Sequence, residues 1–114
     1  MFIISCQNPE QVEPIVTTSE VQNIGISNAS FIGNLVDPGA SASWVYGFVW
    51  SDQPGPNVVT GNLIVLGERT STGAFSSNQE YLSPNTTYYV RAFVADKSFS
   101  TIFYAGEVDF STLK

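Results

Sequence analysis

Short apolar runs alternate with polar turn residues along the whole chain. Gly, Pro, Asn and Ser interrupt the sequence about every 8–15 residues, and the runs between them favour β-branched and aromatic side chains. No window keeps apolar residues at the i, i+3, i+4 and i+7 spacing of an amphipathic helix. The pattern predicts an all-β, seven-stranded antiparallel sandwich of the immunoglobulin-like kind. The seven strands are expected at residues 13–18, 22–34, 44–51, 62–69, 73–82, 86–96 and 102–112.

Period two along a strand assigns its side chains to the two faces of a sheet. On the strand at 86–96, one face carries Tyr88, Val90, Ala92 and Val94, and the other carries Tyr89, Arg91, Phe93 and Ala95. Arginine is rarely buried without a partner, so Arg91 marks the second face as outward.

The same alternation predicts the inward faces of two further strands. On residues 44–51 the large aromatic side chains should face the core, because they bury the most area: Tyr46, Phe48 and Trp50. On residues 102–112 the acidic positions alternate with the set predicted to face inward: Tyr104, Gly106, Val108 and Phe110.

Composition excludes several classes of function. The 114 residues suit one domain, and the net charge is −6 with four scattered basic side chains. Nucleic-acid binding needs a basic surface, as does a polybasic membrane patch, so neither partner is expected. With one cysteine and no histidine, a disulfide within the chain, an ordinary zinc site and a serine triad are excluded. We expect no enzyme and no cofactor.

The first residues resemble the end of a bacterial lipoprotein signal peptide. The run at 2–5 is mostly apolar and ends in a small residue directly before Cys6, which would carry the lipid. A full signal has a basic start and a longer apolar stretch, so this segment is interpreted as truncated. The alternative is a chance cysteine near the terminus. Residues 1–12 are therefore assigned to a truncated signal and tether, and residues 13–114 to the β-sandwich domain.

Several motifs resemble the fibronectin type III-like, immunoglobulin-fold domain of bacterial surface lipoproteins. Residues 82–92 match the corner that leads into its sixth strand, and residues 107–112 match its last strand. Residues 47–51 and 73–75 match two of its other strands. The sequence departs from the family's glycines at three turns or edges, namely Tyr81, Ala105 and the loop at 96–101.

The resemblance implies a non-catalytic spacer or an accessory module for adhesion or glycan handling. It also implies lipid anchoring on the extracellular face of the bacterial outer membrane. Membrane contact would then occur only through a lipid on Cys6, and neighbouring domains could flank this one. Tyr88 takes the place of the structural tyrosine corner, whose hydroxyl group bonds back to the preceding loop.

The outward stripe of Tyr89, Arg91 and Phe93 is the candidate binding face. Aromatic side chains beside an arginine could stack on sugar rings or anchor a protein partner. Alternatively, the aromatics cover Gly47 on the neighbouring strand. The loops at 52–57 and 96–101 are further recognition candidates or plain connections.

Two other features have simpler interpretations. Glu107 and Asp109 lie two apart on one strand, as a catalytic pair could, but no cleft is evident and a solvated face explains them. The run at 62–66 is apolar on both faces. If it forms an edge strand, it could pair with a partner strand, although natural edges are usually protected.

Two alternatives to the spacer domain follow from these features. A carbohydrate-binding module requires exposed, coplanar rings, either Tyr89 with Phe93 or Phe99 with Phe103. A strand-exchanging adhesin subunit requires the strand from Asn62 or the N-terminal strand to detach and swap. The expected partner is accordingly a surface protein or a glycan.

Overall fold

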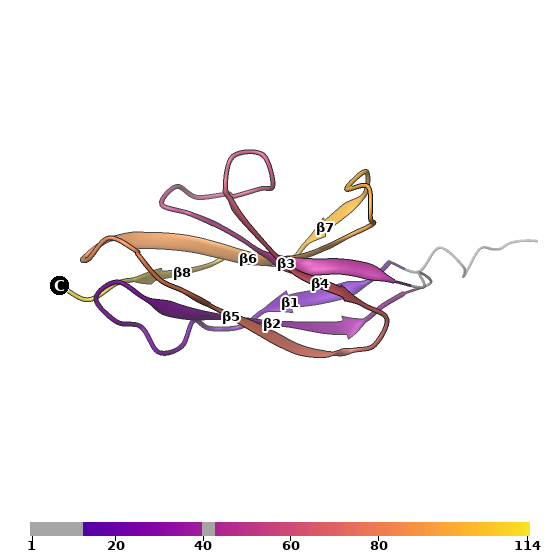
Figure 1. The fold of residues 1–114 in the computed structure, drawn as a ribbon, viewed down its shortest axis with the longest axis horizontal. Helices are drawn as coiled ribbons and strands as arrows, with labels where there is room; N and C mark the ends of the chain where they lie inside the picture. Colours follow the sequence, from indigo (N-terminus) through magenta and orange to yellow (C-terminus); the bar gives the residue numbers. More distant parts are fainter. Residues whose placement is uncertain (1–12, 40–42) are drawn as a thin grey trace, which may run out of the picture.

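The protein is described by a computed structural model that covers residues 13–39 and 43–114. The segment 1–12, including the predicted lipidation site Cys6, lies outside these described residues. The described chain forms two layers of antiparallel sheet (Figure 1). The smaller sheet has the order β1 (Ile15–Thr18), β2 (Ala29–Asp37) and β5 (Gly73–Gln79). The all-β sandwich predicted from the sequence is confirmed.

The larger sheet has the order β4-β3-β6-β7, with β8 also paired to β6. Its strands are β3 (Trp44–Ser51), β4 (Asn62–Arg69), β6 (Thr87–Ala95), β7 (Ile102–Tyr104) and β8 (Val108–Ser111). The expected bounds of the third and fourth strands agree with the structure. The second strand, predicted at 22–34, is shorter in the structure, where it begins at Ala29 and ends at Asp37. Residue 22 forms only an isolated bridge to Ser30.

The single strand expected at 102–112 is divided into β7 and β8 in the structure. Ala105 is buried and its N–H donates to the carbonyl oxygen of Ala92, whereas residues 105–107 belong to neither strand. Phe103 of β7 and Ala105 in the break both pack in the main core, as do Val108 and Phe110 of β8. The alternation therefore shifts by one residue, and the prediction that Tyr104 faces the main core is wrong. Tyr104 packs on the outer side of the sheet instead.

The main core lies between the two sheets and is rich in aromatic rings. Phe31 of β2 has its ring centroid 5.8 Å from that of Phe48 and 5.8 Å from that of Phe110. The inward prediction for β6 is confirmed, since Tyr88, Val90, Ala92 and Val94 all belong to this core. The inward prediction for β3 also holds: Phe48 is fully buried, and Tyr46 and Trp50 pack against the same cluster.

Gly47 is required where β3 meets β4. The register shifts between Tyr46 and Gly47, and a Cβ atom at position 47 would collide with the carbonyl oxygen of Ile64. On its other side, Gly47 is paired with Phe93 of β6. The bulge therefore depends on a residue without a side chain at this position.

The turn before β6 has tyrosine-corner geometry. The backbone N–H of Ser83 donates a 2.8 Å hydrogen bond to the Tyr88 hydroxyl group, whose ring lies in the core. Nearby, Tyr81 has a φ of 64° and is 95% exposed. The family's usual glycine at this position would adopt that left-handed conformation without strain. The departure noted in the sequence thus coincides with a backbone conformation that favours glycine.

Candidate functional site

The predicted binding face on β6 is not an open surface. Phe93 does point away from the main core, but its side chain is fully buried, so the expected exposed aromatic at this position is a wrong prediction. Phe93 forms a second small cluster with Val49 and Ala95, against which Val58, Phe99, Ile102 and Tyr104 pack. The physical reason is that two loops fold onto the outer side of the sheet and exclude water from it.

The first covering loop connects β3 to β4 and rises on the side of the larger sheet opposite the smaller one (Figure 1). Two hydrogen bonds hold it down. The N–H of Val58 donates to the Tyr104 hydroxyl group over 3.0 Å, and the N–H of Gly55 donates to Glu107 Oε1 over 2.6 Å. Pro56 in the same loop is fully buried. This loop is therefore part of the folded domain rather than a free recognition loop.

The second covering loop, at 96–101, is organised by Asp96. Its carboxylate accepts hydrogen bonds from the Ser100 hydroxyl group (2.7 Å) and the Ser100 N–H (2.8 Å). The Ser100 hydroxyl bond, followed by bonds from the backbone of Thr101 and Ser100 and from Ser98, lowers the pKa of Asp96 below its usual 3.8. Phe99 at the tip adopts a φ of 58°, and its ring centroid lies 5.9 Å from that of Phe93. The missing glycine of this loop is thus replaced by a phenylalanine that packs on the sheet.

Tyr89 and Arg91, the other two residues of the predicted face, are half-buried. Arg91 Nε donates to the carbonyl oxygen of Ala105 over 3.1 Å, and its guanidinium carbon lies 4.8 Å from the Tyr104 ring centroid. Tyr89 lies beside Asp109 of β8 and Ser51 of β3. Tyr89 and Arg91 therefore share the outer face with Phe93, but the three side chains do not form an exposed platform.

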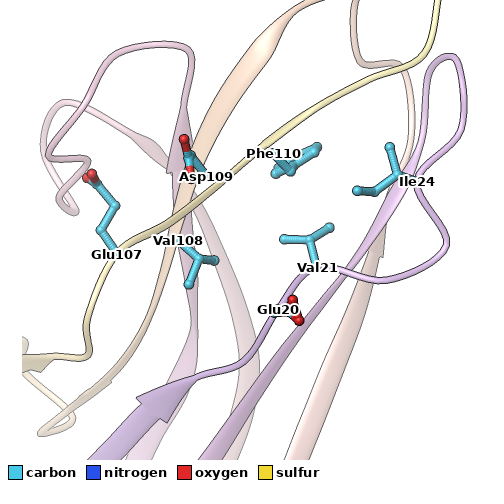
Figure 2. A pocket seen from close by; sticks show the side chains of 7 residues that line it. All are labelled: Glu20, Val21, Ile24, Glu107, Val108, Asp109 and Phe110. Carbon is cyan, nitrogen blue, oxygen red and sulfur yellow. The ribbon is translucent and has the colours of Figure 1, made fainter.

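The carboxylates of the last strand have separate environments. Glu107 accepts the hydrogen bond from Gly55 and so anchors the β3–β4 loop. Asp109 is exposed and has no hydrogen-bond or ion-pair partner among the residues that the structure describes. Both side chains line an open groove of about 440 Å³, together with Glu20, Val21, Ile24, Val108 and Phe110 (Figure 2). Alternation along 107–111 identifies Asp109 as outward, but no pattern in the sequence indicates that Glu20 lines the same groove.

The strand β4 forms an edge of the larger sheet, which is the condition for the apolar run at 62–66 to pair with a partner strand. Leu63 and Val65 lie on its outer side and are 43% and 51% exposed. Glu68 at the far end of β4 is 3.7 Å from Lys97, in an exposed ion pair. Such a pair adds little stability, because water and salt screen it. The part of this edge around Leu63 and Val65 is exposed to solvent.

The residues that the structure describes contain neither a cluster of metal-binding side chains nor a helix that could span a membrane. Within 13–39 and 43–114, no three His, Cys, Asp or Glu side chains come together as metal ligands. Over the same residues, no helix has the length and apolar character that crossing a bilayer requires.

Comparison with known proteins identifies the fold but no closer relationship. No family model and no curated protein matches the sequence. The sensor domain of the anti-sigma factor RsgI4 in Pseudobacteroides cellulosolvens superposes with a TM-score of 0.68 at 16% identity, over 90% of this chain and 97% of that one. The sixth fibronectin type III domain of human fibronectin type III domain containing protein 3 gives 0.53 at 19% identity, over 96% and 90%. At these identities the similarity establishes a fibronectin type III-like fold alone.

Proposed function

We propose that this chain is a non-catalytic spacer and interaction domain of a bacterial cell-surface lipoprotein. The supporting observation is the path of the chain from one end of the sandwich to the other. Ile15 pairs with Asp37 at one end, whereas the N–H of Leu113 bonds to the carbonyl oxygen of Gly25 at the other, near the C-terminus in Figure 1. Termini of domains often lie close together. An end-to-end path instead holds the segments before and after the domain apart.

The surfaces of the larger sheet are consistent with a structural role. Its inner face forms the main core, and the domain's own loops cover the Phe93 region of its outer face. The carboxylate of Asp96 contacts the hydroxyl group of Ser100, but this bond closes the loop at 96–101 on itself. The domain therefore resembles a connector more than a reaction site.

The glycan-binding alternative loses the aromatic platforms on which it depended. Phe93 is buried, and Phe99 packs against it. Phe103 packs edge-on against Trp44, with ring centroids 5.6 Å apart. Of the four rings named for this alternative, this leaves Tyr89, and a single half-buried ring makes a poor stacking surface for a sugar.

Metabolic labelling with an alkyne-bearing palmitate tests the surface-lipoprotein part of the proposal. The protein is expressed from its own gene in its native host, beside Cys6→Ser and the double variant Cys6→Ser, Ser71→Cys. We expect label and membrane association in the wild type and loss of both in the two variants, because a cysteine in the exposed turn at 71 cannot replace the lipidated one. Surface protease should then remove the labelled protein from intact cells. An unlabelled wild-type protein in the soluble fraction would contradict the proposal.

Pairing through the β4 edge is the second candidate function. Exposed Leu63 and Val65 lie on a strand whose backbone is open on one side, which permits pairing with another strand. Sedimentation over a range of concentrations should then reveal dimers that Leu63→Lys, Val65→Lys abolishes. The matched change Val36→Lys, at a site 47% exposed on β2, should leave them intact. A monomer at all concentrations would exclude self-pairing.

A further inference from the structure

The groove beside β8 has one wall from each sheet layer. On one side lies β8, which pairs with β6, and no other described strand pairs with its second edge. On the other side lies the segment between β1 and β2, with Val21 and Ile24 toward the groove. Figure 2 shows Val108 directed toward Val21 across this space. The groove thus combines an open strand edge with an apolar floor.

The wall opposite β8 is held in place by backbone hydrogen bonds. The N–H of Gln22 donates to Ser30 over 3.0 Å, and the N–H of Ser30 donates back to Gln22 over 2.9 Å. The N–H of Gly25 donates to Asn28 over 2.8 Å. Because both walls are fixed to sheets, a ligand would enter a largely preformed groove, which reduces the entropy lost on binding.

The rim of the groove is acidic. Glu20, Glu107 and Asp109 all line it, and none of the described residues around the groove is a lysine or an arginine. Glu107 accepts the bond from Gly55, whereas Glu20 and Asp109 have no hydrogen-bond or ion-pair partner within the described part of the chain. The whole chain carries a net charge of −6. An occupant of this groove must therefore be positively charged to gain from its electrostatics.

We propose that the groove binds an extended basic segment of a partner protein, which adds to the free edge of β8 as a further strand. Main-chain hydrogen bonds to β8 would supply affinity, and alternate side chains would supply specificity. On β8, Val108 and Phe110 face inward, whereas Asp109 points away from the core (Figure 2). The bound segment should therefore alternate apolar residues, directed at Val21 and Val108, with Lys or Arg placed beside Asp109.

Other occupants do not fit this combination of edge and charge. A second copy of the chain has only four basic residues, and Arg69 and Arg91 pack on aromatic rings of their own domain. Nucleic acids and anionic membranes carry the same sign of charge as the rim. The proposal does not depend on the spacer role, so its failure would leave that role untouched.

The first test uses a fluorescein-labelled peptide of alternating valine and lysine, flanked by glycines, and measures its anisotropy with the intact chain. The variant Glu20→Gln, Asp109→Asn removes two charges from the rim. Its control, Asp52→Asn, Glu80→Gln, removes two charges from positions outside the groove. The variant removes two carboxylates that attract the lysines of the peptide, so binding to the rim variant should be about fivefold weaker. Binding to the control should change less than about twofold, since neither side chain lines the groove and exposed charges are screened.

The second test distinguishes strand addition from simple charge attraction. Two versions of the peptide carry N-methyl groups on alternate amides, one set for each edge of the strand. Only the version methylated on the edge facing β8 should lose binding, because it cannot donate its hydrogen bonds. Backbone amide signals of 108–111 should shift when the unmodified peptide binds.

Four results would overturn the proposal. They are no binding of the unmodified peptide at millimolar concentration, equal weakening by the rim and control variants, equal affinity of the two methylated peptides, and unshifted amides in β8. Unfolding midpoints of the two double variants, measured in parallel, ensure that both proteins are folded.

Discussion

The hydroxyl group of Tyr104 accepts a 3.0 Å hydrogen bond from the backbone N–H of Val58, 46 residues earlier in the chain. The contact joins β7 to the β3–β4 loop across the outer face of the larger sheet. Arg91 lies over the same tyrosine ring, and Phe93 is buried in the adjoining cluster. Tyr104 thus connects the loop that covers the sheet with the residues that it covers.

Tyr104→Phe should loosen the β3–β4 loop at Val58 without disturbing the main core. The variant loses one hydrogen bond, so the free energy of unfolding should fall by about 0.5–1.5 kcal/mol. The Val58 amide proton should exchange faster, because its acceptor is gone. Urea denaturation and NMR hydrogen exchange measure the two effects. Tyr89→Phe is the control: no hydrogen bond to the Tyr89 hydroxyl group is found in the described residues, and its stability should change by less than about 0.5 kcal/mol.

Tyr81→Gly should stabilise the domain. The tyrosine adopts a φ of 64° with its side chain 95% exposed, so no packing of the ring compensates the backbone strain. Left-handed backbone costs a residue with a side chain about 1–2 kcal/mol, whereas the greater freedom of glycine in the unfolded chain offsets roughly 0.5–1 kcal/mol. A net gain of about 0.5 kcal/mol in the free energy of unfolding is expected. Tyr81→Ala retains the strain and should give no gain; equal stability of the two variants would contradict the explanation.

The loop at 96–101 should lose its order in acid. Hydrogen bonds to the Asp96 carboxylate, chiefly from the Ser100 hydroxyl group, lower the pKa of Asp96 below 3.8 in the folded state. Stability from these bonds is therefore fully present above pH 3.8 and is lost as the pH falls through the lower folded-state pKa. NMR titration of the Asp96 side-chain carbon gives this pKa directly. Ser100→Ala should raise the value toward 3.8, whereas a wild-type titration at or above 3.8 would refute the prediction.

The sandwich and most of its strands could be predicted because alternation and turn residues are local signals. The bounds of β3 and β4 follow from the runs between residues 44 and 69. The division between β7 and β8 could not be predicted in this way. In the sequence, Ala105 and Gly106 do not interrupt the alternation of inward and outward side chains. The contact of Ala105 with Ala92, which the sequence does not show, moves the inward positions by one residue.

The candidate site was less predictable because its burial depends on contacts between distant segments. Alternation indicates that Phe93 points away from the main core, and it does. The sequence marks 52–61 as a loop but contains no local signal that Val58 will bind Tyr104 and close the outer face. The same limit applies to Glu20 and Asp109, which the fold alone brings to one groove.

Closure of the outer face is tested most directly by comparing Phe93→Ala with Tyr89→Ala in urea denaturation. Phe93 is fully buried, so its truncation should lower the free energy of unfolding by about 3–5 kcal/mol. Tyr89 is half-buried and lies outside the buried cluster, so its truncation should cost much less, about 1 kcal/mol. That difference is the result predicted for a sheet covered by its own loops. A similar, small loss for both variants would mean that Phe93 is exposed in solution, and would restore the open binding face expected from the sequence.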